Sequence, residues 1–173
     1  MEIRTERLLL RSWRRDDADA EALVRHANHR AVWRNTGGLP FPYGRAEAET
    51  FFAYLDANSH ETHLAIVEGD APVGGIGIYR RKGLEQFTGE LGYWLGPSAW
   101  GRGYATEAAR VLVEHTFATT ELTRLAGRVF AWNPASCRVL EKAGFRREGV
   151  KQRAAFKDEQ FVDEFLYARL RGE

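Results

Sequence analysis

Cysteine is almost absent from this sequence, and so are long apolar runs. Cys137 is the only cysteine, which excludes an internal disulfide bond and is typical of a reducing compartment. The first residues, MEIRTERLLLR, contain only three consecutive leucines, so they lack the hydrophobic region of a secretory signal peptide. No stretch approaches the about 20 apolar residues of a membrane-spanning helix. We therefore expect a soluble cytoplasmic protein without a membrane partner.

An excess of charge of one sign is also missing. The 25 lysine and arginine residues are balanced by 24 aspartate and glutamate residues, so no overall field attracts nucleic acid or an anionic membrane. Repeats, low-complexity tracts and linker-like shifts of composition do not occur. A hydrophobic fraction of 44% supplies enough apolar surface for one core. We expect a single domain over residues 1–173 and no nucleic-acid partner.

What the sequence does contain is a clear change of hydrophobic period along the chain. Helical periodicity predicts helices over residues 17–30, 45–58, 104–117 and 134–144. Other segments predict strands over 7–13, 63–69, 71–81, 87–96 and 124–133, and a closing strand pair within 145–170. Gly69-Asp70 is a hairpin signal between two of these strands. Strands that pair locally in the middle and later alternate with helices predict a mixed α/β sheet with both faces covered.

Single residues mark the ends and faces of two predicted helices. Asn133 suits the N-cap of the last helix, Pro134 its first position and Gly144 its C-terminal stop. Three charged residues of the helix over 104–117 stand at spacings that allow weak ion pairs with one another: Glu107, Arg110 and Glu114.

Three glycines, a proline and two bulky aromatic residues are concentrated in GPSAWGRGYATEA, residues 96–108, directly before a predicted helix. Such a turn presents backbone N–H groups at the positive end of the helix dipole, a geometry that binds phosphate. A tight turn without a ligand is the alternative, and the turn alone leaves both open. A Walker A loop would need Lys-Ser/Thr after its last glycine, and a Rossmann loop would need a third glycine at Thr106. Neither motif is present.

Four segments in the right order resemble the GNAT N-acetyltransferases. Trp100-Gly101-Arg102-Gly103-Tyr104-Ala105 matches their acetyl-CoA loop, Gln/Arg-x-x-Gly-x-Gly/Ala, except that Trp100 replaces the first residue. TERLLLR, residues 5–11, resembles the first strand of the branch that contains the ribosomal-protein N-acetyltransferases of the RimJ and RimL type. NPASCRVLEKAGF (133–145) resembles the second CoA motif of that branch, and DEFLYARL (163–170) resembles its closing strand. The resemblance spans nearly the whole chain.

This resemblance implies a fold and a cosubstrate. The fold is a mostly antiparallel sheet of about six to seven strands, splayed in the middle, with helices on both faces. The cosubstrate is acetyl-CoA, and no metal is needed. The glycine turn would bind the pyrophosphate, the end of the preceding strand would pair with the pantetheine arm, and the second motif would contact that arm and its sulfur. The residues so assigned are Tyr93, Trp94, Leu95, Gly101, Arg102, Gly103, Tyr104, Ala105, Thr106, Asn133 and Ser136.

Two residues are candidates for catalysis in the family reaction, the direct attack of an amine on the acetyl thioester. Glu90 is the candidate base, because glutamates at about this place on the strand serve other family members. Its alternative is a solvent-facing strand carboxylate. Ser136 is the candidate hydrogen-bond donor to the leaving thiolate, and its alternative is a helix-start residue that satisfies backbone groups. Arg102 either adds charge at the phosphate or is a solvated arginine.

Other polar residues have plainer interpretations. Cys137 follows Ser136 at a helix N-terminus, which can lower a thiol pKa; a small buried hydrophobe is its expected role, and a covalent acetyl-cysteine route is the alternative. Tyr167 is interpreted as a packing residue of the closing strand, with a proton donor as the alternative. The segments HANH (26–29) and HETH (60–63) are not accompanied by a carboxylate or thiol cluster, so we interpret their histidines as surface residues rather than metal ligands.

The sequence does not identify the acceptor amine. In the family the acceptor enters from the side opposite CoA; Trp33, Phe41, Tyr43 and Phe156 are candidate wall residues, with a place in the core as the alternative for each. The resemblance favours a protein N-terminus. The alternatives are a small amine (a polyamine, an amino acid or an aminoglycoside) and a non-catalytic acyl-CoA sensor. The oligomeric state is open, a homodimer included.

Overall fold

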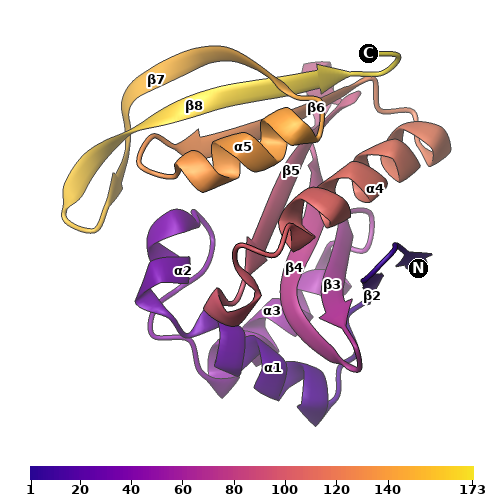
Figure 1. The fold of residues 1–173 in the computed structure, drawn as a ribbon, viewed down its shortest axis with the longest axis vertical. Helices are drawn as coiled ribbons and strands as arrows, with labels where there is room; N and C mark the ends of the chain where they lie inside the picture. The colour runs from indigo at the N-terminus through magenta and orange to yellow at the C-terminus, as the bar shows by residue number, and fades with distance from the viewer.

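Eight strands form one open sheet in the computed structural model, which describes residues 1–173 (Figure 1). Their order is β1-β2-β3-β4-β5-β6-β8-β7, and every neighbouring pair is antiparallel except β5 and β6. The strands are β1 (Glu2–Arg4), β2 (Leu9–Ser12), β3 (Thr62–Glu68), β4 (Ala71–Arg80), β5 (Thr88–Leu95), β6 (Arg124–Phe130), β7 (Arg146–Lys157) and β8 (Gln160–Leu170). The expected mixed, mostly antiparallel sheet is confirmed.

The expected number of strands, about six to seven, is too low, because β1 was not predicted. This strand has only three residues, and Ile3 in its middle pairs with Leu10 of β2. Charged residues stand on both sides of Ile3, so the strand contains a single apolar side chain. One apolar residue is too little for a periodic signal, and only the pairing with β2 makes this segment a strand.

Five α-helices cover the two faces of the sheet: α1 (Asp17–Ala27), α2 (Arg30–Asn35), α3 (Arg45–Ala57), α4 (Tyr104–Thr119) and α5 (Pro134–Lys142). Successive residues of β3 define the two layers, since neighbouring side chains of a strand point to opposite faces. Leu64 and Ile66 pack into the core that contains α4 and α5 residues, whereas Ala65 and Val67 pack into the core that contains α1 and α3 residues. No helix combines the length and the apolar character needed to cross a membrane.

The helix expected over residues 17–30 ends earlier in the structure, at Ala27. A further helix that was not predicted, α2, begins at Arg30 after two non-helical residues. The side chain of Asn28 accepts a hydrogen bond from the backbone N–H of Tyr43 at 3.0 Å, which ties this break to a distant loop. His29 is extended and precedes α2 as its N-cap. A tertiary contact therefore accompanies the end of α1, which comes before the end that the sequence predicts.

The sheet is splayed between β5 and β6, as expected. The two strands pair over only three residue pairs, the last of which is Glu90 with Ala126. Beyond this pair, β5 continues to Leu95 and β6 to Phe130 without pairing with each other. The gap between the two strands therefore begins at Glu90 and leaves this side of the β5 backbone without a strand partner.

Candidate active site

The glycine turn between β5 and α4 has a backbone that only glycine adopts readily. Gly101 has φ 73° and Gly103 has φ 81°, both in the left-handed region. Gly103 is also the N-cap of α4, and no side chain caps this helix. A helix leaves its first N–H groups without internal acceptors, and here no side-chain oxygen takes them. The start of α4, which includes Tyr104, Ala105 and Thr106, is therefore suited to bind an anion.

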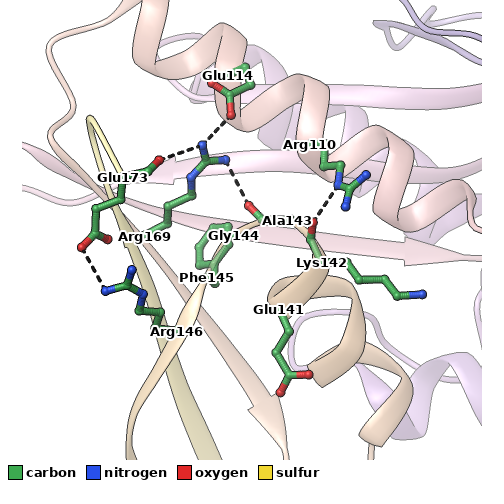
Figure 2. Close-up of a pocket in the computed structure, with 10 residues that line it drawn as sticks. All are labelled: Arg110, Glu114, Glu141, Lys142, Ala143, Gly144, Phe145, Arg146, Arg169 and Glu173. Carbon is green, nitrogen blue, oxygen red and sulfur yellow. Dashed lines mark hydrogen bonds and ion pairs between the residues drawn. The ribbon is translucent and has the colours of Figure 1, made fainter.

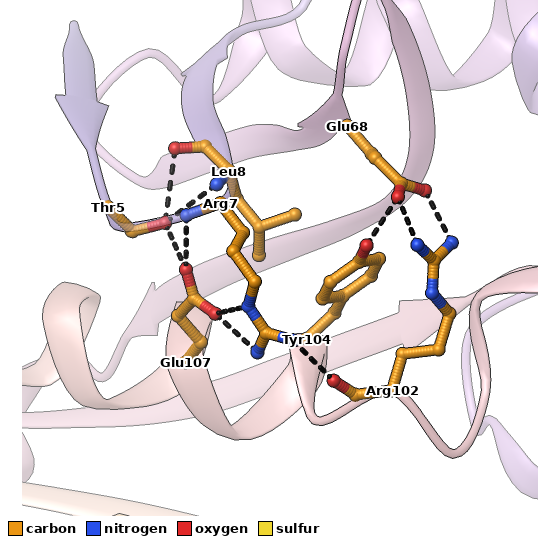
Figure 3. Close-up of polar contacts among 7 residues, drawn as sticks. All are labelled: Thr5, Arg7, Leu8, Glu68, Arg102, Tyr104 and Glu107. Atoms are coloured by element: carbon orange, nitrogen blue, oxygen red, sulfur yellow. Dashed lines mark hydrogen bonds and ion pairs between the residues drawn. The ribbon is translucent and has the colours of Figure 1, made fainter.

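Arg102, between the two glycines of this turn, forms an ion pair with Glu68 (Figure 3). Its guanidinium donates two hydrogen bonds to the Glu68 carboxylate of β3, at 2.8 and 2.5 Å. The Tyr104 hydroxyl donates to the same carboxylate. The hydrogen bond from Tyr104, together with Arg102, outweighs desolvation and holds the pKa of Glu68 below its ordinary value. The sequence alternatives for Arg102 were a phosphate contact and a solvated side chain; neither included this pairing with Glu68.

The three predicted pantetheine-binding residues of β5 alternate between the two faces of the sheet, with Tyr93 and Leu95 on one face and Trp94 on the other. Tyr93 packs against the core on the α4 side, whereas Trp94 packs against the core on the α1 and α3 side. The carbonyl oxygen of Leu95 accepts a hydrogen bond from the indole N–H of Trp100 at 2.8 Å. One of the backbone groups predicted to pair with pantetheine is therefore already in a hydrogen bond, which leaves its second lone pair for a further donor.

Ser136 lies in the first turn of α5, opposite Tyr93. The predicted start of this helix is confirmed: Pro134 is its first residue, and the Asn133 side chain accepts from the backbone N–H of Ser136 at 3.1 Å. The hydroxyl groups of Tyr93 and Ser136 are 2.7 Å apart and hydrogen-bonded. Burial raises the pKa of Tyr93, which keeps its hydroxyl protonated and able to donate. Ser136 is thus linked to β5 across the gap in the sheet.

Glu90 lies where the gap begins and faces the side away from Tyr93. Its two carboxylate oxygens are in ion pairs, one with Arg128 at 2.7 Å and the other with Arg81. Since residues three apart on a strand point to opposite faces, Glu90 and Tyr93 lie on the two sides of the sheet. The candidate base and the candidate thiolate donor, Ser136, therefore flank the gap from opposite faces.

A second polar cluster lies beside Glu90. Tyr79 of β4 is its direct neighbour across the strand pair, and the His63 ring packs against the Tyr79 ring with centroids 4.9 Å apart. The Glu61 carboxylate is within hydrogen-bond distance of His63 at 2.9 Å and accepts from Tyr54 at 2.7 Å. Desolvation alone would raise the pKa of Glu61, but these two hydrogen bonds lower it. The interpretation of His63 as a surface histidine is wrong, because its side chain is 8% exposed.

Two of the four predicted acceptor-wall residues form one aromatic pair. The Trp33 ring on α2 lies 6.0 Å from the Phe41 ring, and the Lys157 ammonium of the β7–β8 hairpin lies 4.1 Å above Trp33. Phe156 is 65% exposed on the same hairpin, and its ring packs against Phe161. Tyr43 is 2% exposed and belongs to the core beneath α1 and α3, which was its alternative.

Cys137 and Tyr167 have the plainer roles that the sequence suggested. Cys137 is buried and belongs to the core on the α4 side. Tyr167 is also buried, and its hydroxyl donates to Glu141 of α5 at 3.0 Å. Groups of three or more histidine, cysteine, aspartate or glutamate side chains placed to hold a metal ion do not occur in the structure.

A pocket of about 600 Å³ lies at the end of α5 remote from Ser136 (Figure 2). Arg110 donates to the carbonyl of Lys142 at 2.7 Å, and Arg169 donates to the carbonyl of Ala143 at 3.0 Å. These bonds satisfy carbonyl groups at the C-terminal end of α5, so the two arginines have a structural role here.

The ion pairs that were expected along α4 do not form, so this prediction is wrong. Glu107 pairs with Arg7, and Glu114 pairs with Arg169. Arg110 donates to the Lys142 carbonyl.

Several residues around the site were not predicted from the sequence. They are Arg7, Glu68, Arg81 and Arg128, all of which form ion pairs with residues of the turn, of α4 or of β5. Their partners lie 9 to 100 residues away along the chain and in other elements, so local spacing could not identify them. Of the four, only Arg7 lies in a segment that the sequence singled out, TERLLLR, and that segment was interpreted only as a strand.

Sequence comparison identifies relatives over the whole chain. The family described as "Acetyltransferase (GNAT) domain" matches residues 7–146. The uncharacterized N-acetyltransferase YnaD of Bacillus subtilis (strain 168) is 29% identical over 177 residues, covering 100% of this chain and 99% of its own. The ribosomal-protein-serine acetyltransferase of Escherichia coli (strain K12) is 34% identical over 116 residues, covering 67% of this chain and 64% of its own.

Solved structures share the fold. A GNAT-family acetyltransferase from Bacillus anthracis superposes with a TM-score of 0.84 at 27% identity, with both chains fully covered. RimL, a ribosomal L7/L12 alpha-N-protein acetyltransferase in complex with coenzyme A, has a TM-score of 0.86 at 19% identity and 98% coverage of both chains. Spermidine N-acetyltransferase from Vibrio cholerae, in complex with CoA and spermine, has a TM-score of 0.79 at 18% identity, covering 95% of this chain and 96% of its own. This chain therefore belongs to the GNAT family and is an acetyl-CoA-dependent N-acetyltransferase.

Proposed function

We propose that this enzyme transfers the acetyl group of acetyl-CoA to the α-amino group of a protein N-terminus, by direct attack while both substrates are bound. The observation that carries the proposal is the gap between β5 and β6, with Glu90 on one face and Ser136 on the other. Such a gap admits the thioester from one face and the amine from the opposite face. We place the reaction in one domain and in the cytoplasm, as predicted from the sequence.

The glycine turn is the proposed pyrophosphate site. Its support is the pair of left-handed glycines, Gly101 and Gly103, and the uncapped start of α4. A backbone cradle of this kind binds phosphate through N–H groups that no side chain screens. The pantetheine arm would then follow β5 between Tyr93 and Leu95, where the strand has no partner on its β6 side. Asn133 would contact the arm while it caps α5.

The chemistry needs one proton acceptor and one donor. The amine nitrogen attacks the thioester carbonyl carbon, the C–N bond forms, and the C–S bond breaks to release the CoA thiolate. The proton that the nitrogen loses passes to Glu90, on a lone pair that Arg81 and Arg128 leave free. Ser136 donates a hydrogen bond to the thiolate and accepts one from Tyr93, whose hydroxyl lies 2.7 Å from it. A hydrogen bond to a charged group is stronger than one to a neutral group.

The charges around the α2 and β7–β8 surface favour an acceptor with a single amine. Asp158 of the hairpin is held by Arg30 at 2.6 Å and Arg34 at 2.9 Å. The hydrogen bond from Arg30, followed by that from Arg34, lowers the pKa of Asp158. Glu90, at the gap in the sheet, is likewise paired with two arginines. A polyamine needs carboxylates whose charge is not already balanced, whereas the charges of Asp158 and Glu90 are each balanced by two arginines.

The acceptor is tested with a thiol-release assay. Acetyl-CoA is supplied with N-terminal peptides of differing first residue, with polyamines or with aminoglycosides. We expect turnover with free N-terminal peptides and none with the same peptides whose α-amino group is blocked. Turnover with polyamines or aminoglycosides alone would replace the proposed acceptor by a small amine. Binding of acetyl-CoA without turnover on any amine would favour the sensor alternative.

A further inference from the structure

Arg7 reaches from the turn between β1 and β2 to the glycine turn before α4 (Figure 3). Its Nε donates to the Glu107 carboxylate at 2.8 Å, and a second nitrogen lies 2.6 Å from the same oxygen. Its remaining terminal nitrogen donates to the backbone carbonyl of Arg102 at 2.9 Å. A single guanidinium therefore connects the first turn of α4 with the residue between Gly101 and Gly103.

Glu107 is firmly placed to hold Arg7. Its carboxylate also accepts from the Thr5 hydroxyl at 2.5 Å and from the backbone N–H of Arg7 at 2.9 Å. Desolvation would raise the pKa of Glu107, but the hydrogen bonds from Thr5 and Arg7 lower it. The Tyr104 ring lies against the Arg7 guanidinium at 4.9 Å and against the Arg102 guanidinium at 4.5 Å. The position of Arg7 is thus fixed by several independent contacts.

The contact with the Arg102 carbonyl has a consequence for the neighbouring N–H. In a trans peptide unit, the carbonyl of one residue and the N–H of the next point in opposite directions. When Arg7 holds the Arg102 carbonyl on the β1–β2 side of the turn, the Gly103 N–H is directed to the other side. That N–H belongs to the proposed pyrophosphate cradle.

We propose that Arg7, held by Glu107, is a positioning residue that orients the Arg102–Gly103 peptide for pyrophosphate binding. This inference rests on the proposed placement of the pyrophosphate on the glycine turn. Arg7 acts through the backbone, because its guanidinium is engaged by a carboxylate and a carbonyl on the side of the turn away from the Gly103 N–H. Its role is geometric and does not depend on its charge alone.

Two cosubstrates separate this role from a general effect on folding. Acetyl-CoA contains the pyrophosphate, whereas acetyl-pantetheine has the same thioester and arm without it. We expect Arg7→Ala to raise the Kd for CoA, measured by calorimetry, about tenfold, equivalent to about 1.4 kcal/mol. The KM for acetyl-pantetheine should stay within about twofold of the wild-type value. Equal losses with both cosubstrates, or an unchanged Kd for CoA, would overturn the proposal.

Two further variants distinguish position from charge. Arg7→Lys keeps the charge, but a single ammonium cannot bridge the Glu107 carboxylate and the Arg102 carbonyl as the planar guanidinium does. We expect it to bind CoA as weakly as Arg7→Ala, and full rescue of binding by lysine would overturn the proposal. Arg4→Ala removes an exposed arginine of β1 and should leave the Kd unchanged.

Folding and the pyrophosphate site are checked separately. A thermal melt shows whether each variant is folded. If Arg7→Ala does not fold, Glu107→Gln serves as the test instead, because it weakens the hydrogen bonds to Arg7 without shortening a side chain. It should raise the Kd for CoA and spare acetyl-pantetheine. Failure of the wild-type protein to bind CoA would contradict the proposed pyrophosphate site itself, and normal wild-type binding with no variant effect would contradict only the role of Arg7.

Discussion

At the scale of single residues, Gly103 combines a left-handed backbone with a place in the proposed phosphate cradle. Its φ of 81° is unfavourable for any residue with a Cβ, and its N–H belongs to the proposed phosphate cradle. We predict that Gly103→Asp abolishes CoA binding, since the carboxylate also repels the phosphates. Calorimetry measures this directly. Gly37→Asp is the control, because a Cβ at Gly37 meets nothing within 4 Å; unchanged CoA affinity in Gly103→Asp would show that the turn does not bind the pyrophosphate.

Ser136 is predicted to act in turnover more than in binding. Ser136→Ala removes the hydroxyl that lies 2.7 Å from the Tyr93 hydroxyl and is proposed to contact the thiolate. A hydrogen bond to a charged group contributes about 1.5–3 kcal/mol, so kcat should fall about tenfold to a hundredfold. The Kd for CoA should change much less. Tyr93→Phe, which leaves the serine but removes its partner, should lower kcat by a smaller factor. Equal loss of kcat and CoA affinity in Ser136→Ala would make it a binding residue.

Glu90 is predicted to accept the amine proton. Glu90→Gln keeps the shape of the side chain and removes the proton acceptor, so kcat should fall about a hundredfold or more while the KM for acetyl-CoA changes little. Steady-state kinetics at saturating acceptor measure this. Glu148→Gln is the matched control, because Glu148 is also paired with an arginine, Arg124, at 2.8 Å. If both variants retain wild-type kcat, another group takes the proton.

At the scale of elements, one buried ion pair joins α1 to β2. Arg11 and Asp19 are 4% and 1% exposed, and two hydrogen bonds of 2.7 and 2.6 Å connect them. Removal of one member leaves a buried charge without its partner, so Asp19→Asn should lower the free energy of unfolding by about 3–5 kcal/mol. Urea denaturation measures the loss.

Asp17 provides the comparison on the same helix. It forms an ion pair with Arg45 at 2.6 Å, but both side chains are exposed. Asp17→Asn should therefore cost about 0–1 kcal/mol. Similar costs for the two variants would contradict the account of the buried pair, because burial is the main difference between them.

The elements differ in how far the sequence predicted them. α5 was predicted well because its signals are local: Asn133 caps it, Pro134 begins it, and Gly144 follows it with a positive φ. β1 and α2 were not predicted, because tertiary contacts decide them. A three-residue strand exists only by pairing with β2, and the break before α2 coincides with the bond from Tyr43 to Asn28.

At the scale of the whole molecule, stability should fall in two windows as the pH is lowered. Burial, followed by the charges of Arg25 and His29, lowers the pKa of His26 below 6.5. Near pH 6.5 the unfolded chain therefore binds a proton at His26 more readily than the folded protein does. The free energy of unfolding thus decreases as the pH falls through 6.5. A urea-midpoint series shows this window, which should disappear in His26→Gln and persist in the control His60→Gln. Persistence in both variants would assign the window to another group.

The second window belongs to the carboxylates. Hydrogen bonds and ion pairs lower the folded-state pKa of several acidic groups, so their stabilisation is present above the unfolded value and is lost as the pH falls through the folded one. The urea midpoint should therefore decrease again below pH 4.5. A flat profile in this range would contradict the assigned contacts. The groups are Glu61, Glu68, Glu107, Glu148 and Asp158.

The candidate site was predictable only where its signal lies in a short segment. The glycine turn and the start of α5 are contiguous motifs, and the structure brings Ser136 next to Tyr93 across the gap. The ion pairs were not predictable. Glu107 was expected to interact along its own helix, but its partner Arg7 comes from a turn 100 residues earlier. Likewise, His63 was expected at the surface, yet it is covered by tyrosine rings from α3 and β4. Only the fold brings such residues together.

The central claim is acetyl transfer from acetyl-CoA to an N-terminal α-amino group. The most direct test incubates the enzyme with acetyl-CoA and a peptide that has both a free N-terminus and an internal lysine, and then locates the acetyl group by fragmentation mass spectrometry. We predict acetylation of the α-amino group and none in the N-terminally blocked peptide. Acetylation confined to the lysine, or none on any peptide while a small amine is acetylated, would contradict the claim.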